Sequence, residues 1–275
     1  MRILVSADME GATGVTCTAD VDVGTTQWQR FRSLFTGDVN ACVCGLFAGG
    51  ATEVLVNEAH SSQRNIFLED LDERARMLTG RHKPLSMMQG IDSGVDGVVF
   101  LGYHAAAGAR GVLAHTYLPN SIIGVRLDGE LAGEGRLNAA LAAEYGVPVL
   151  LVTGDDLTCA DAAGYAPDAH TVTVKEAVSR YAAICQPPAR TAAAITEAAR
   201  RSMTLAGRGE GHPRPHRVEV EFDATHLADA AAVVPTVSLA GERTVGFDAP
   251  NMTDAMKALK IVTAIAAGAV EGCYG

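Results

Sequence analysis

The stretch RILVSADMEG, residues 2–11, places a short apolar run directly before two carboxylates, Asp8 and Glu10. Carboxylates are costly to bury at the end of a strand unless something positive meets them. Two later apolar runs end in a similar way, EVLVNEAH in His60 and GVVFLGYH in His104. Ligands of open α/β sheets bind beyond the carboxyl ends of the strands, so these four side chains are predicted to converge at one edge.

Short apolar runs alternate with helical patterns, which is typical of an α/β fold with a mostly parallel sheet flanked by helices. Over 26–48 apolar residues recur at three- and four-residue steps until Gly49-Gly50, so a helix is predicted there. Asp128-Gly129 follows a strand pattern and suits a tight hairpin turn. Further elements are predicted as strands at 121–126, 147–153, 217–222 and 243–247, and as helices at 64–78, 134–145 and 251–270.

The residue pattern of the sequence changes after Gly154. We expect an α/β metal-site domain over 1–154 and a smaller, mixed α/β C-terminal subdomain over 155–275. Within the second part, RGEGHPRPHR (208–217) is rich in Pro, Arg and His and is predicted to be an exposed linker.

The composition limits the class of protein. The 275 residues carry a formal net charge of −10, which argues against nucleic acid or an anionic membrane as a partner. No apolar run is long enough for a transmembrane helix, and an acidic residue at position 8 comes too early for a signal peptide, so a cytoplasmic location is expected. The six cysteines show no CxxC spacing and are expected to be reduced. Cys42 and Cys44 lie in the helix predicted at 26–48 and are expected to be buried as small apolar residues.

Carboxylates and imidazoles together are ligands suited to Zn²⁺ or a similar divalent ion. Glu134 opens a predicted helix between two glycines, in LAGEGRLN, and is a fifth candidate ligand beside Asp8, Glu10, His60 and His104. Five ligands are too many for one closed tetrahedral ion but suit two ions that share a carboxylate. We therefore expect two Zn²⁺ per subunit, with other divalent metals as an alternative, and a two-metal hydrolase.

His115, in GVLAHTYLPN, is open to three interpretations: a further ligand, a structural residue, or a catalytic group that carries protons or attacks as a nucleophile. Asp155 and Asp156 also end an apolar strand and are rival ligands. Glu58 is expected to support His60 from close by. No GxGxxG or P-loop pattern is present, so a nucleotide cofactor has no support. The remaining histidines are interpreted as surface residues: His82, His170, His212, His216 and His226.

SADMEG, EVLVNEAH, FLGYHA, HTY and VPVLLVTGDD occur in the order and spacing of the zinc-dependent D-aminopeptidases. The chain resembles that family over residues 1–185 and again in TVGFDAPNMTDAMKALKIV. The resemblance implies release of N-terminal D-residues, especially D-Ala, from short peptides with a free N-terminus, by a homo-oligomer built as a ring-based decamer. It implies the dizinc ligands Asp8 (bridging), Glu10, His60, His104 and Glu134, and His115 as the catalytic residue, which the family assigns as the nucleophile.

Two other functions would use similar residues. A dinuclear phosphoesterase takes the same kinds of ligand and would hydrolyse phosphate esters. A non-catalytic dipeptide-binding protein would bind its ligand without turnover. The expected function is therefore a metallo-aminopeptidase, with these two as alternatives.

Overall fold

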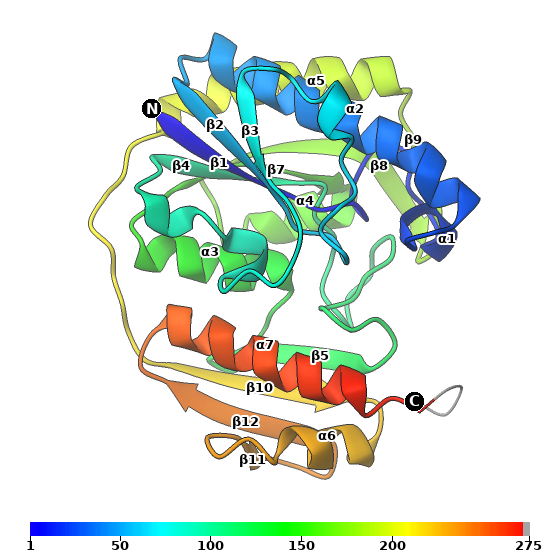
Figure 1. Cartoon of the computed structure of the whole chain (residues 1–275), viewed down its shortest axis with the longest axis vertical. Coiled ribbons are helices and arrows are strands. Elements are labelled where there is room, and N and C mark those ends of the chain that lie inside the picture. Colours follow the sequence, from blue (N-terminus) through cyan, green and yellow to red (C-terminus); the bar gives the residue numbers. More distant parts are fainter. Residues whose placement is uncertain (272–275) are drawn as a thin grey trace.

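The computed structural model describes residues 1–271 and contains a seven-stranded sheet, sheet A, and a five-stranded sheet, sheet B (Figure 1). Sheet A has the strand order β3-β2-β1-β4-β7-β8-β9. Every neighbouring pair in it is parallel except β8 and β9. The predicted mostly parallel sheet is thereby confirmed. Its strands are β1 (Arg2–Ala7), β2 (Glu53–Glu58), β3 (Ala75–Leu78), β4 (Gly97–Leu101), β7 (Val149–Asp155), β8 (His170–Ser179) and β9 (Ala182–Cys185).

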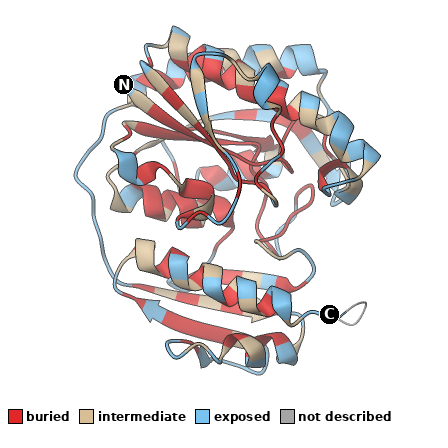
Figure 2. Ribbon diagram, in the orientation of Figure 1, coloured by how far each residue is buried: buried red, intermediate tan, exposed pale blue. Residues whose placement is uncertain are grey.

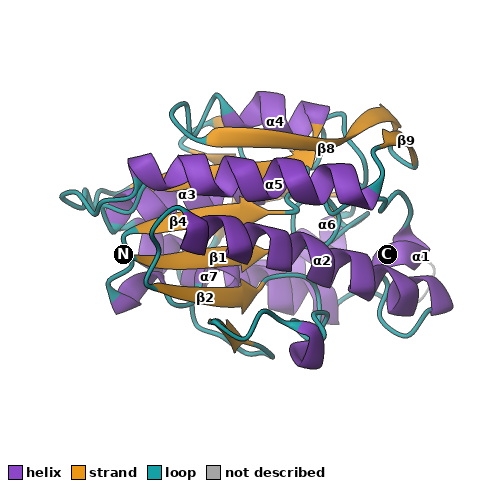
Figure 3. Cartoon of the chain, turned by 90° about the horizontal axis from the view of Figure 1, so that it is seen from above, coloured by secondary structure: helices purple, strands orange, loops and turns teal. Residues whose placement is uncertain are grey.

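Helices cover both faces of sheet A, because successive residues of its buried strands point to opposite sides. Ile3 and Val5 of β1 pack in the core under α2 and α5, whereas Leu4 packs in the core that includes α3. Figure 3 shows α2 and α5 lying side by side over the sheet. The helices that accompany sheet A are α1 (Thr18–Val21), α2 (Thr26–Ala48), α3 (Glu134–Glu144), α4 (Asp156–Ala162) and α5 (Pro188–Ser202).

Sheet B forms a second layer and is antiparallel, in the order β11-β12-β10-β5-β6. Helix α7 packs between this sheet and α3, where the Glu144 carboxylate accepts the backbone N–H groups of Met252 and Thr253 (Figure 1). The elements are β5 (Ile122–Leu127), β6 (Glu130–Leu131), β10 (His216–Phe222), α6 (Thr225–Ala231), β11 (Ser238–Leu239), β12 (Thr244–Ala249) and α7 (Met252–Gly268). Figure 2 shows buried residues running through both sheets.

The predicted hairpin at Asp128-Gly129 is confirmed, with φ of +54° and +88° at the two turn residues. The predicted helix at 64–78 is wrong. Only Leu68–Asp70 form a short 3₁₀ turn there, and β3 pairs with β2 as a parallel edge strand. Three further 3₁₀ turns cover Ser86–Met88, Ile91–Ser93 and Met203–Leu205.

Membership of sheet A and of sheet B does not switch at residue 154 of the sequence. The hairpin of β5 and β6 belongs to sheet B, while β8, β9 and α5 lie with sheet A. The division into domains at 154/155 stays a prediction. Across residues 1–271, no helix is both long and apolar enough to cross a membrane.

Two predictions for single residues need correction. His216 is buried, not at the surface, because it opens β10 and its Nδ1 lies 2.9 Å from Asp128 Oδ2. Cys42 is buried as expected, but Cys44 is exposed on the same helix. All five cysteines in the described residues are free thiols, and Cys273 lies outside those residues.

Candidate metal centre

Three neighbouring strands of sheet A bring Asp8, His60 and His104 to one edge. The parallel register pairs Ala7 of β1 with Glu58 of β2 and with the last residue of β4. The residues that follow these three strands therefore emerge together. Asp8 Oδ1 lies 3.5 Å from His60 Nδ1, and Asp8 Oδ2 lies 3.4 Å from His104 Nε2. The two oxygens of one carboxylate thus face two different imidazoles.

Glycines allow the turns after these strands to come this close. Gly102 has φ +69°, and a Cβ on it would lie 2.1 Å from the backbone oxygen of Asp8. A Cβ on Gly11 would lie 1.9 Å from the backbone oxygen of Tyr103. The Gly11 N–H instead donates to the Gly102 carbonyl at 2.8 Å. Any larger side chain at either position would push the Asp8 turn away from the His104 turn.

Two more carboxylates and a third imidazole complete the cluster. Glu10 Oε2 lies 2.9 Å from His60 Nδ1, and its Oε1 lies 3.6 Å from His115 Nε2. Glu134, the first residue of α3, places Oε2 at 3.6 Å from His104 Nε2. All six side chains are buried, with residues 2–8% exposed. The structure therefore brings together every residue predicted for the site.

One ring nitrogen of each of the three imidazoles lies at hydrogen-bond distance from a backbone carbonyl oxygen. Because a carbonyl only accepts, we assign a proton to that nitrogen, which leaves the other nitrogen facing carboxylate oxygens. Histidines that bind metals are held in this way. The contacts are His60 Nε2 to the Val21 oxygen at 2.9 Å, His104 Nδ1 to the Ala105 oxygen at 3.0 Å and His115 Nδ1 to the Leu113 oxygen at 2.7 Å.

The electrostatics of the cluster favour positive charge between the carboxylates. Burial would raise the pKa of Asp8, but its contacts with His104 and His60 outweigh burial and hold the pKa well below its usual range. Burial would lower the pKa of His60 and His104. The charges of Glu10, beside His60, and Glu134, beside His104, outweigh it and raise both pKa values. Without a metal ion, protons on these two imidazoles offset the carboxylate charge.

His115 differs from the other two imidazoles. Its ring stacks on His104 with centroids 4.1 Å apart and an interplanar angle of 8°. Burial lowers its pKa, and the neighbouring His104 lowers it further. His115 is therefore a neutral imidazole at the edge of the cluster, with Nε2 turned toward Glu10.

The cluster fits a divalent metal. Asp8 Oδ2 and His104 Nε2 are buried without a hydrogen-bond partner among residues 1–271. An unsatisfied buried polar atom costs ~1–3 kcal/mol, and coordination of a cation would satisfy both atoms. The two sets that share Asp8 together contain all five predicted ligands, as expected of a carboxylate shared by two ions. The sets whose ligand atoms all lie within 4.8 Å are Asp8–Glu10–His60, Asp8–His104–Glu134 and Glu10–His104–His115.

The alternative ligands, Asp155 and Asp156, accept backbone hydrogen bonds outside the cluster. Asp155 caps α4, where it accepts the N–H of Thr158 at 2.7 Å, and it also accepts the N–H of Val112. Asp156 accepts the N–H of Ala177. Glu58 supports the loop after His60 by accepting two backbone N–H groups at Asn65 and Ile66. None of the three carboxylates belongs to a convergent ligand set in the described residues.

Sequence reasoning missed two residues that contact the site. Tyr117, with φ +58°, donates its backbone N–H to Glu134 Oε1 at 2.8 Å. Lys175 of β8 donates its ammonium to the backbone oxygen of Glu10 at 2.6 Å. Tyr117 could have been suspected from its place next to the His115 segment. No local pattern marks Lys175.

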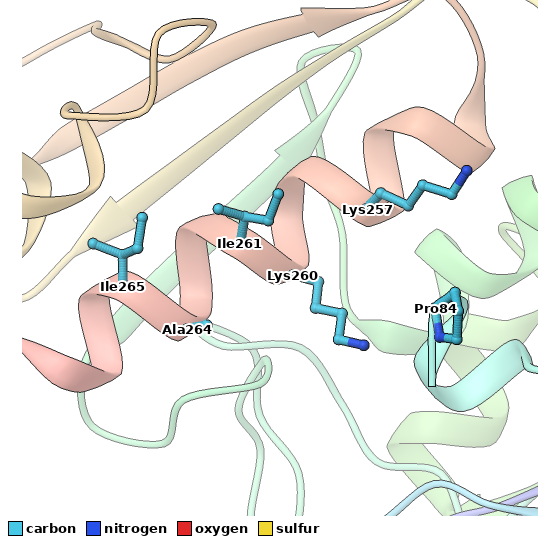
Figure 4. A pocket seen from close by; sticks show the side chains of 6 residues that line it. All are labelled: Pro84, Lys257, Lys260, Ile261, Ala264 and Ile265. Atoms are coloured by element: carbon cyan, nitrogen blue, oxygen red, sulfur yellow. The ribbon is translucent and has the colours of Figure 1, made fainter. Parts of the chain in front are cut away.

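A hollow of about 470 Å³ lies elsewhere, between α7 and Pro84 (Figure 4). Lys257, Lys260 and Ile261 are among the residues that line it, and none of the cluster residues does. The candidate centre is therefore recognised by the chemistry of its ligands and not by the size of a cavity.

Comparison with known proteins gives a consistent result. Residues 1–261 match the peptidase family M55, described as D-aminopeptidase. A D-aminopeptidase of Bacillus subtilis (strain 168) is 36% identical over 274 residues, which cover 97% of this chain and 98% of that protein. The solved structure of the Zn-dependent D-aminopeptidase DppA from Bacillus subtilis, a self-compartmentalizing protease, superposes with a TM-score of 0.93. It is 34% identical, with 97% of this chain and 98% of that chain covered.

Proposed function

Because the chain belongs to the D-aminopeptidase family M55, we propose that it is a zinc-dependent aminopeptidase that removes an N-terminal D-residue from short peptides. The observation that carries this proposal is the Asp8 carboxylate, whose two oxygens face His60 and His104 in two separate ligand sets. The Zn-dependent relative supports zinc as the metal. D-Ala is the proposed N-terminal residue.

The proposed ligands of two Zn²⁺ per subunit are Asp8, as a bridge, with Glu10, His60, His104 and Glu134. When bound, the ions would supply Lewis acid chemistry at the scissile carbonyl and an anchor for the free amine of the substrate. An amine held beside the reacting carbonyl restricts cleavage to the first peptide bond. Exopeptidase action follows from that restriction.

His115 is the proposed catalytic residue. Its Nδ1–H is fixed on the Leu113 carbonyl, so Nε2 is the free acceptor on the side of the cluster. We assign Nε2 the task of taking a proton from the attacking water and delivering it to the leaving nitrogen. The family resemblance suggests direct attack by His115 instead. Acid quenching during turnover distinguishes the two, because only direct attack leaves an acyl group on His115.

We also propose a cytoplasmic homo-oligomer, built as a ring-based decamer. The self-compartmentalizing relative supports an assembly that encloses its active sites. Enclosure would restrict entry to short or unfolded peptides. Sedimentation or mass photometry of the purified chain measures the assembly size directly.

Hydrolysis of D-alanyl and L-alanyl p-nitroanilide, before and after chelation and with zinc added back, tests the function. We expect the D-substrate to be cleaved, activity to vanish on chelation and zinc to restore it. Equal cleavage of both enantiomers would remove the proposed stereospecificity. Turnover of p-nitrophenyl phosphate without peptidase activity would favour a phosphoesterase, and binding without any turnover would favour a dipeptide-binding protein.

A further inference from the structure

Lys175 is a buried cation whose partners all lie in the turn after β1. Its residue is 0% exposed in β8. The ammonium donates to the backbone oxygens of Glu10 at 2.6 Å, Ala12 at 2.9 Å and Val15 at 2.7 Å. A lysine ammonium has three N–H donors, so all of them are used on this one turn.

The three carbonyls converge on a single point, and an ammonium is what makes that arrangement stable. Convergent carbonyl oxygens repel one another through their partial negative charges, and burial keeps water from solvating them. On its other side the turn is pressed against the end of β4, where Gly11 donates to Gly102. The turn is therefore fixed from both sides, by β4 and by Lys175.

The carboxylate at the start of this turn is part of the candidate centre. Glu10 contacts His60 at 2.9 Å and faces His115 at 3.6 Å. Its backbone oxygen is the one held at 2.6 Å by Lys175. A shift of the turn by a few tenths of an ångström would carry the Glu10 carboxylate with it. The geometry of the ligand set thus depends on a residue that touches none of the ligand atoms.

We propose that Lys175 is a positioning residue for the metal centre, since its ammonium holds the Glu10–Val15 turn so that Glu10 faces His60 and His115. This inference rests on the proposed function only in that the centre binds zinc. Lys175 sets how tightly the ions are held, and it takes no part in the chemistry itself.

The test replaces Lys175 by methionine, K175M, which keeps an unbranched side chain of similar length and removes the donors. Zinc affinity of the metal-free protein is measured by competition with a chromophoric chelator. We expect the affinity to fall about 10- to 100-fold, the range for loss of a group that supports metal ligands. The visible spectrum of the Co²⁺-loaded protein should change as well, because it reports the coordination geometry.

V220A is the matched control, because Val220 is fully buried in sheet B and remote from the turn. It should lower stability while leaving zinc affinity and the Co²⁺ spectrum unchanged. If K175M lowers stability but keeps wild-type zinc affinity and spectrum, Lys175 is only structural and the inference is wrong.

If K175M does not fold, K175Q is measured instead, because its shorter and neutral side chain has only two N–H donors and cannot hold all three carbonyls. Lower zinc affinity with a changed Co²⁺ spectrum supports the inference, and wild-type affinity and spectrum contradict it. A wild-type chain that binds no zinc would overturn both the proposed function and this inference. If the wild type binds zinc and the Lys175 variants keep its zinc affinity and Co²⁺ spectrum, only this inference is wrong.

Discussion

The carboxyl end of sheet A buries a cluster of ionisable side chains, whereas the core of sheet B buries apolar side chains. At the end of sheet A, six ionisable side chains are 2–8% exposed and face one another, and Asp8 Oδ2 and His104 Nε2 lack partners in the described chain. In sheet B, β10 buries Val218, Val220 and Phe222 and leaves its charged residues partly exposed. Buried His216 has its own carboxylate partner.

This contrast separates binding from stability. Burying carboxylates that face one another lowers stability unless a cation is present. Apolar side chains packed in sheet B contribute stability whether or not the site is filled. Substitutions at the end of sheet A should therefore change metal binding and activity, and substitutions in sheet B should change unfolding.

The largest effect is expected from D8N, which removes the charge that the Asp8–Glu10–His60 and Asp8–His104–Glu134 sets share. With the Lewis acid lost, kcat/KM should fall by about 10⁴-fold, or roughly 5 kcal/mol. Steady-state hydrolysis of D-alanyl p-nitroanilide and metal analysis of the same sample measure it. A D8N protein that keeps two zinc ions and wild-type activity would contradict the role of Asp8.

F222A in sheet B should lower the stability of the fold and leave zinc binding unchanged. Phe222 is fully buried, and replacing a buried Phe by Ala costs about 3–5 kcal/mol of unfolding free energy. Urea unfolding of the metal-free protein measures the loss. Zinc affinity of the folded fraction should match the wild type; a parallel loss of affinity would mean that the two regions are coupled.

Asp38 of α2 should make stability depend on pH. Burial raises its pKa to about 6, although Thr13 donates to both carboxylate oxygens. The folded state therefore binds more protons than the unfolded state between pH 3.8 and about 6, so this group's contribution falls as pH rises. The expected loss is about 3 kcal/mol, complete above about pH 6.

D38N is the matching variant, since Asn can still accept from the Thr13 N–H. The wild type should lose stability relative to D38N as pH rises from 4 to 6.5, as measured by urea unfolding. A constant difference across that range would show that Asp38 does not titrate with a raised pKa.

E221Q should have the smallest effect. Glu221 pairs with Arg243 at 2.8 Å on the surface of sheet B, with both side chains more than 40% exposed. An exposed pair contributes less than ~1 kcal/mol. Like D8N, this change turns a carboxylate into an amide, yet stability and zinc content should stay near wild type. A large loss of either would erase the contrast between the two regions.

The candidate site could be predicted from sequence because three of its residues each follow a different strand of sheet A. Asp8, His60 and His104 need only a parallel register to meet, and the apolar runs before them indicate that register. Glu134 was marked by the glycines around it. These signals are local, so a single sequence contains them.

The features that sequence did not reveal depend on partners far along the chain. Lys175 meets Glu10 across 165 residues. The segment 64–78 has helical spacing, but Glu58 holds its start as a loop and β2 pairs with its end as a strand. The hairpin of β5 and β6 joins sheet B through β10, which lies far beyond it in sequence.

A zinc titration of the metal-free wild-type chain, followed by calorimetry beside D8N, tests the central claim most directly. Two tightly bound zinc ions per subunit in the wild type, and loss of tight binding in D8N, are the predicted result. A wild-type chain that binds one ion or none, or a D8N chain that still binds two, would contradict the account of a shared carboxylate between two ions.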